Sequence, residues 1–102
     1  MIHVLATIEL QPGTRGRFLE EFARNVPNVR AEHGCLEYGA AVDVPTGLAN
    51  QSPLRDNVVV VIEKWDDLEA LRAHLAAPHM TAYRARVRDF VVRSAIQVLD
   101  PA

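Results

Sequence analysis

Alternating apolar and polar positions predict four strands in this chain. At the start, apolar residues fill every second position, which is typical of a strand over residues 2–10 with one strongly apolar face. Similar alternation or β-branched runs predict strands over 35–44, 57–65 and 91–99. The segment 57–65, NVVVVIEKW, is apolar on both faces. Both faces of that strand must therefore be covered in the folded protein.

Between the first two predicted strands, apolar residues recur with the spacing of an amphipathic helix. Thr14 is placed to N-cap a helix, and Gly34 fits its end. Pro27 is expected to kink or split this helix, because proline removes one hydrogen bond and its ring presses on the preceding turn. The predicted buried stripe consists of Phe18, Leu19, Phe22, Ala23 and Val26.

Two further helices are expected between the third and fourth strands. Asp66 and Glu69 have the spacing of a capping box, so a helix should begin there. Pro78 ends that helix and starts the next, because proline is favoured at the first helical position. The predicted buried residues are Leu68, Leu71 and Leu75 on the first of these helices and Met80, Tyr83, Val87 and Phe90 on the second.

The order strand, helix, strand, strand, helix, strand predicts an α+β ferredoxin-like βαββαβ sandwich, with 1–102 as a single domain. One layer of helices covers only one face of such a sheet. The doubly apolar strand 57–65 therefore indicates that a second subunit covers the other face, so we expect a homodimer. The segment 45–56, rich in turn formers, is longer than a hairpin requires.

Composition and charge exclude several classes of protein. A formal net charge of -2 gives no pull toward nucleic acid or anionic membranes. The longest aliphatic run, 58–62, is too short to span a bilayer, and the first residues do not resemble a signal peptide. A lone Cys35 suits a reducing compartment, so we expect a cytoplasmic protein. Dinucleotide and phosphate-loop motifs are missing, and we expect no cofactor.

Aromatic and acid–base side chains gather around the strand 57–65. Glu63 and Trp65 share one strand face, and Tyr38 lies on another strand. Three more candidates border the apolar stripes of the helices: His74, His79 and Tyr83. If that strand face lies under the helices, these groups line a mostly apolar cleft, which is the usual site for a small molecule.

Structural roles compete with functional ones for each candidate. Trp65 can be a core aromatic, and Glu63 can form an ion pair with His74 or Arg72. Residues 74 and 79 are separated by about 140° around a helix, so no metal site is expected from this pair. His3 can face the cleft or the dimer contact. The arginines at 84, 86 and 88 are interpreted as a solvated face.

Two stretches of the chain are distinctive: EHGCLEY at 32–38 and EKWDDLEALRAHLAAPH at 63–79. Both resemble sequences of the antibiotic biosynthesis monooxygenase family, which consists of small dimeric α/β-barrel proteins. The resemblance implies two ferredoxin-like subunits packed sheet to sheet and metal- and flavin-free oxygenation of a quinol, anthrone or other electron-rich aromatic by dioxygen. It also implies that Trp65 and Tyr38 shape the pocket, that His74 or His79 accepts a proton and that Glu63 orients it.

Two features depart from the pattern of the family, the long 45–56 segment and Pro27. Other functions compatible with the same residues are a cofactor-free isomerase of a small signalling metabolite, a haem-degrading relative and a non-catalytic dimeric ligand-binding module.

Overall fold

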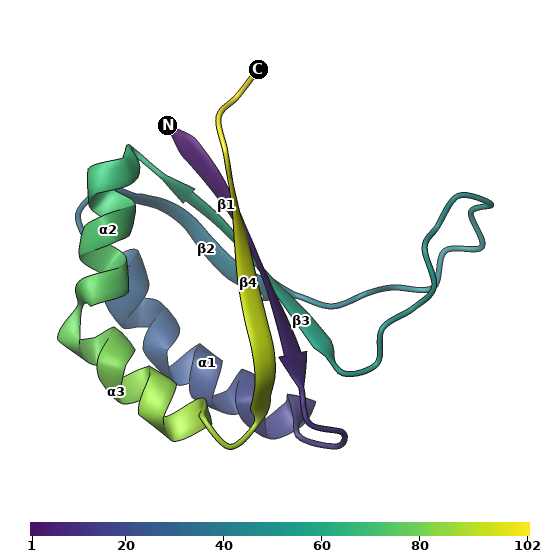
Figure 1. The fold of residues 1–102 in the computed structure, drawn as a ribbon. Coiled ribbons are helices and arrows are strands. Elements are labelled where there is room, and N and C mark those ends of the chain that lie inside the picture. Colours follow the sequence, from purple (N-terminus) through teal and green to yellow (C-terminus); the bar gives the residue numbers. More distant parts are fainter.

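A computed structural model describes residues 1–102 and shows a four-stranded antiparallel sheet with its three helices on one face (Figure 1). The strand order is β2-β3-β1-β4, which confirms the predicted ferredoxin-like α+β fold. None of the helices is long and apolar enough to cross a membrane. The elements are β1 (Ile2–Leu10), α1 (Arg15–Arg30), β2 (Cys35–Ala41), β3 (Val58–Trp65), α2 (Leu68–Ala76), α3 (Pro78–Val87) and β4 (Val91–Leu99).

The two faces of the sheet differ in burial because side chains alternate along each strand. Under the helices, Val59, Val61, Glu63 and Trp65 of β3 are all buried. The intervening residues belong to the opposite face, where Ile62 pairs with Leu5 of β1 and both side chains stay 39% exposed. Apolar surface is thus left uncovered on the face away from the helices.

Two expectations for α1 were wrong, and a third, its N-cap, was right in position only. The helix runs unbroken from Arg15 to Arg30. Pro27 lies in its last turn, so only a short stretch of helix follows the proline, and the Ala31 N–H still donates to the Pro27 carbonyl. Thr14 occupies the N-cap position, but its hydroxyl donates to the Gln11 carbonyl instead of capping the helix. Ala23 is exposed, and Asn25 takes a buried position on the stripe.

The start of α2 also differs from the prediction. Asp67, not Asp66, is the N-cap, and its side chain accepts a hydrogen bond from the Ala70 N–H at 2.9 Å. Leu68 and Leu75 are exposed, because the helix turns Ala70, Leu71 and His74 toward the core. The predicted proline at the start of α3 is confirmed, as are buried Met80, Tyr83 and Val87.

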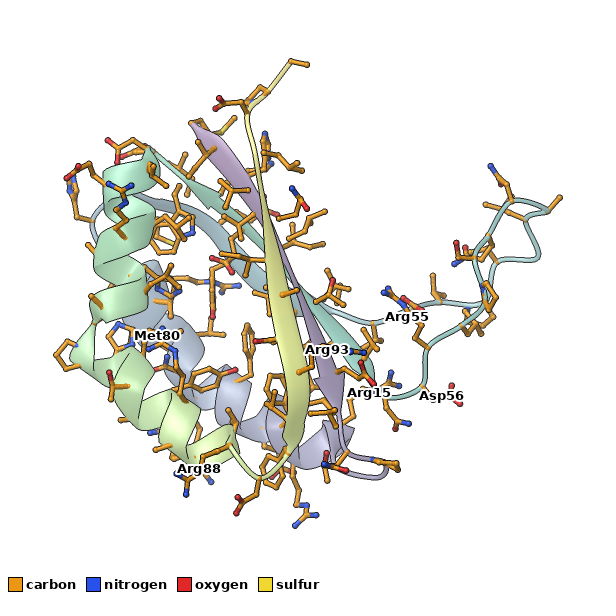
Figure 2. All side chains as sticks on the ribbon, viewed as in Figure 1. Arg15, Arg55, Asp56, Met80, Arg88 and Arg93 are labelled. Carbon is orange, nitrogen blue, oxygen red and sulfur yellow. The ribbon has the colours of Figure 1, made fainter.

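Strand β2 ends at Ala41 rather than at residue 44, and residues 42–57 form an arm that projects from the body of the molecule (Figure 1). At the root of the arm, the Asp43 carboxylate accepts from the Arg55 guanidinium at 2.8 and 2.9 Å. Arg15 of α1 donates to the Arg55 and Val58 carbonyls at 3.4 Å (Figure 2). The arm is therefore anchored at its base, while its apolar residues Val44 and Leu48 are exposed.

Candidate active site

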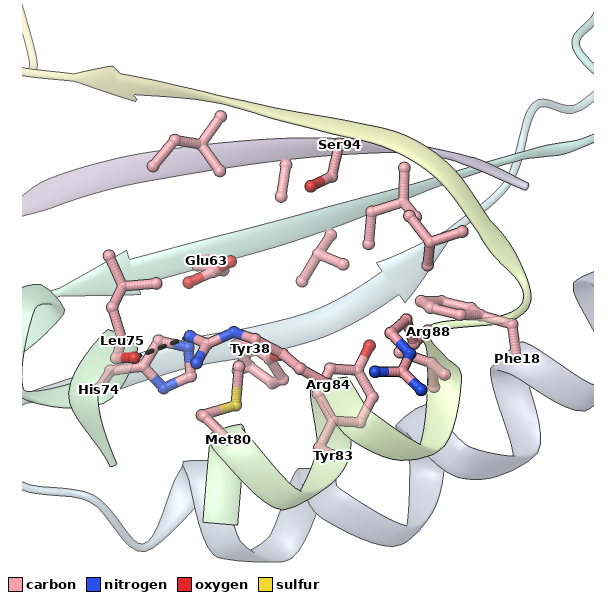
Figure 3. Close-up of a pocket in the computed structure, with 16 residues that line it drawn as sticks. Phe18, Tyr38, Glu63, His74, Leu75, Met80, Tyr83, Arg84, Arg88 and Ser94 are labelled. Atoms are coloured by element: carbon pink, nitrogen blue, oxygen red, sulfur yellow. Dashed lines mark hydrogen bonds between the residues drawn. The ribbon is translucent and has the colours of Figure 1, made fainter. Parts of the chain in front are cut away.

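A cavity of about 370 Å³ lies between the sheet and the helices α2 and α3. Its wall is mostly apolar, and Figure 3 shows the polar side chains that enter it. From the sheet come Tyr38, Glu63 and Ser94, and from the helices His74, Tyr83, Arg84 and Arg88. An apolar hollow with a few convergent polar groups suits a small aromatic molecule.

The sheet side of the cavity carries a buried carboxyl, Glu63, which is 6% exposed. Its Oε1 accepts a hydrogen bond from the indole Nε1–H of Trp65 at 2.9 Å. Burial raises the pKa of Glu63 to about 7, although the Trp65 hydrogen bond opposes the rise. The hydrogen-bond partner of Glu63 is thus Trp65, not His74 or Arg72. The Glu63 carboxyl can hold or release a proton near neutral pH.

The helix side of the cavity carries His74, which is 2% exposed. Its Nδ1 lies 2.7 Å from the Oε2 of Glu32. The imidazole packs against Trp65 with ring centroids 4.7 Å apart and against Tyr38 at 5.5 Å. Burial lowers the pKa of His74, and the Glu32 carboxylate partly counteracts that effect. An imidazole in this setting is suited to accept a proton.

Glu32 was not among the predicted site residues, and the turn that holds it depends on Gly34. Gly34 has a φ of +82°, and a Cβ at this position would lie 2.6 Å from the Cβ of Ala70 on α2. The Asp66 N–H donates to the Gly34 carbonyl at 2.8 Å. This close approach brings the α1–β2 turn against α2 and so places Glu32 beside His74.

Other predicted site residues lie outside the cavity wall. Trp65 is fully buried behind His74 and Glu63. His79 lies 3.6 Å from the same Glu32 oxygen, too far for a hydrogen bond, and both of its ring nitrogens are buried without a partner. His3 pairs with Lys64 and Leu99 and belongs to the other sheet face, so it does not reach the cavity.

The arginines at 84, 86 and 88 are all exposed, as the solvated-face interpretation expects, but they also make specific contacts. Arg86 donates to Glu21 of α1 at 2.9 Å. Arg84 and Arg88, one turn apart, both line the cavity, and Arg84 also donates to the Leu75 carbonyl at 2.7 Å (Figure 3). No group of three His, Cys, Asp or Glu side chains is placed to hold a metal ion.

Known proteins match the chain along most of its length. YgiN of Escherichia coli strain K12, named "Probable quinol monooxygenase YgiN", is 40% identical over 103 residues, which cover 99% of this chain and 98% of YgiN. A match this complete leaves no room for 45–56 as an insertion relative to YgiN, so the long segment is not a departure from that relative. YcnE of Bacillus subtilis strain 168, named "Putative monooxygenase YcnE", is 29% identical over 91 residues, which cover 89% of this chain and 86% of YcnE.

Solved structures and a family match agree with these relatives. The crystal structure of PA3566 from Pseudomonas aeruginosa superimposes with a TM-score of 0.79 at 25% identity, covering 99% of this chain and 93% of that one. Rv0793 from Mycobacterium tuberculosis gives a TM-score of 0.78 at 26% identity, with 99% and 94% covered. Residues 1–86 match the family described as "Antibiotic biosynthesis monooxygenase". These matches confirm the predicted resemblance and the predicted monooxygenase class, and the chain belongs to the antibiotic biosynthesis monooxygenase family.

Proposed function

We propose that this protein oxidises a quinol, an anthrone or another electron-rich aromatic with dioxygen and uses neither metal nor flavin. The observation that carries the proposal is the apolar cavity in which a carboxyl with a pKa of about 7, Glu63, and the buried imidazole of His74 enter from opposite walls. The name of YgiN, a quinol monooxygenase by description, supports the same substrate class.

In the proposed reaction the substrate supplies every electron. A base in the cavity removes a proton from the aromatic, and the electron-rich anion passes one electron to dioxygen. The two radicals combine into a peroxide anion, which takes the proton back from the base. Loss of water then leaves a new carbonyl, so one oxygen atom enters the product and the other leaves as water. A dry, apolar wall protects the radical pair from solvent.

Each side chain of the site has a role in this scheme. Tyr38 and Tyr83 shape the aromatic pocket, and Trp65 backs it. His74 is the favoured proton acceptor over His79, because His74 lines the cavity and His79 does not. Glu63 orients the substrate or exchanges a proton with it, rather than orienting His74, since its carboxyl is bound to Trp65.

We also propose that the protein works as a homodimer joined through the uncovered sheet face, as the resemblance implies. The exposed apolar pair Leu5 and Ile62 lies at the centre of that face, with Leu99 toward one end. His3 lies on the same face, in the contact rather than in the cavity. The cytoplasm is the proposed compartment, because the lone Cys35 has no disulfide partner.

Oxygen uptake by metal-stripped protein tests this function. We expect uptake with at least one member of a panel of hydroquinones and anthrones, surviving chelation. His74→Ala should lower kcat about 100-fold or more, because general-base catalysis typically contributes that much. Trp65→Phe should lower kcat less, since it removes the hydrogen bond to Glu63 and part of the buried ring but keeps an aromatic side chain behind His74.

His33→Ala is the matched control, because this exposed histidine lies beside Glu32 yet outside the cavity. It should leave uptake unchanged. Uptake that disappears with chelation would contradict metal-free chemistry. Product formation under strict anaerobiosis would instead identify an isomerase, and a Soret shift on adding haemin would indicate a haem-binding relative.

A further inference from the structure

Glu32 lies between two hollows of the molecule. On one side its carboxylate contacts His74, whose ring forms part of the wall of the 370 Å³ cavity. On the other side Glu32 lines a second, more polar depression of about 260 Å³, together with His33, Asp67, Glu69, Ala70 and Ala73. Glu32 therefore reaches a solvent-facing surface and a buried catalytic candidate at the same time.

The contact between Glu32 and His74 determines which nitrogen of the imidazole carries the proton. An ionised carboxylate can only accept a hydrogen bond. At 2.7 Å from Glu32, Nδ1 must therefore be the protonated nitrogen of a neutral His74 ring. The lone pair is then on Nε2, the nitrogen that has no such bond. In this tautomer the imidazole can take a proton from a molecule in the cavity.

The surroundings of His74 also favour the charge that it gains on taking a proton. The carboxylate of Glu32 is directly opposite, and the Trp65 ring lies 4.7 Å from the imidazole, within the range of a cation–π contact. The indole is itself held by its hydrogen bond to Glu63. Two carboxyls thus fix the two aromatic rings, one acting on the imidazole and the other on the indole.

We propose that Glu32 is a positioning residue of this active site: it keeps the proton on His74 Nδ1, directs the Nε2 lone pair to the substrate and balances the imidazolium formed during the reaction. This inference rests on the proposed function. In the step concerned, the bond between the substrate and its proton breaks, the electron pair stays on the substrate, and a bond between the proton and Nε2 forms. The proton later returns to the peroxide oxygen.

Several charged or titratable groups surround His74, and a pH profile must be interpreted with all of them. They are Glu32 from the α1–β2 turn, His79 and Arg84 from α3, Tyr38 from β2 and, across the cavity, Glu63 from β3. Of the groups that shift the pKa of His74, Glu32 alone raises it, whereas His79 and Arg84 lower it. Removing the Glu32 charge should therefore lower the pKa of His74 further.

Glu32→Gln tests the inference, because glutamine keeps the size and an oxygen acceptor but removes the charge. Nitrogen-15 NMR of the histidine rings would follow the tautomer and pKa of His74 without any substrate. We expect the resting ring to lose its preference for the Nδ1-protonated form and its pKa to fall. Glu69→Gln is the matched control, since Glu69 lines the same surface depression and makes no contact with His74. It should leave both quantities unchanged.

Oxygen uptake provides the second readout. Glu32→Gln should lower kcat about 100-fold with little change in KM and move the acid limb of the pH profile to lower pH. In a His74→Gln background the same substitution should lower kcat no further, because the two residues act together.

An unchanged His74 tautomer and pKa would overturn the assignment of Glu32, whatever the activity. Normal kcat despite a shifted pKa would overturn its role in the reaction. If the unaltered protein consumes no oxygen with any substrate of the panel, the proposed function and the role of Glu32 in it are both overturned. The NMR measurement would still show whether Glu32 and His74 are paired.

Discussion

Glu63 shows how a single buried carboxyl can lower the stability of the folded protein. Its pKa is about 7 in the folded protein and 4.5 for an ordinary glutamate, so the folded state binds its proton more tightly than the unfolded state does. The folded protein is therefore favoured below pH 4.5, and this advantage is lost as the pH rises through 7. At pH 8 the cost of ionising a buried carboxyl applies in full. It amounts to at most about 3 kcal/mol.

Glu63→Gln should remove that cost while keeping an oxygen for the Trp65 N–H. We expect the variant to be more stable than the unaltered protein at pH 8, by up to about 3 kcal/mol, and to show little difference at pH 4.5. Urea unfolding at both pH values measures this. Glu20→Gln, at an exposed carboxylate of α1, should change stability at neither pH. A loss of stability at pH 8 would show that the carboxylate has a favourable partner that offsets its burial.

At the scale of elements, the packing of the α1–β2 turn on α2 determines whether Glu32 meets His74. Gly34→Ala would place a methyl group 2.6 Å from the Ala70 Cβ, in a backbone region that alanine rarely adopts. We expect a loss of about 2–4 kcal/mol, from backbone strain and overpacking together. The turn should also move away from α2, so kcat should fall as the Glu32–His74 contact opens. Thermal unfolding and oxygen uptake measure the two effects.

Gly13→Ala distinguishes the effect of backbone strain from the effect of the steric clash with Ala70. Gly13 has a similar φ of +79°, but nothing lies within 4 Å of the Cβ that it would gain. This variant should lose only the strain, about 1–2 kcal/mol, and keep its activity. Adding Ala70→Gly to Gly34→Ala should recover part of the stability, because it removes the colliding atom. Equal losses from the two glycine variants would mean that the turn and α2 are free to separate.

The sequence predicted the elements better than their contacts. Period-2 alternation was enough to place Glu63 and Trp65 on one buried face of β3, because side-chain direction in a strand is local. Glu32 was missed because it lies in a turn, 42 positions from His74, and only tertiary packing joins them. Its one signal was its place at the start of EHGCLEY. The N-cap was misplaced by one residue because Asp66 and Asp67 are equally suited to cap a helix.

At the scale of the whole molecule, the uncovered sheet face is the surface on which the proposed dimer depends. Gly39, Ile62, Leu5 and Gln97 form one row across all four strands, and none of them is covered by a helix. The exposed apolar side chains of Leu5 and Ile62 at the middle of this row are a typical surface for contact with a second copy of the chain. We expect the protein to have the mass of two chains by light scattering after size-exclusion chromatography.

Ile62→Lys should convert this dimer into monomers, because it would bury an unpaired ammonium group at the centre of the contact. Leu68→Lys is the matched control: Leu68 is similarly exposed, at 44% against 39% for Ile62, but it lies on α2, on the other side of the sheet. It should stay dimeric. Since the cavity is on the helix side, an Ile62→Lys monomer that keeps full oxygen uptake would show that each subunit holds a complete site. A dimeric Ile62→Lys protein would instead indicate that the contact lies on another surface, with the exposed apolar residues of the 42–57 arm as the next positions to vary.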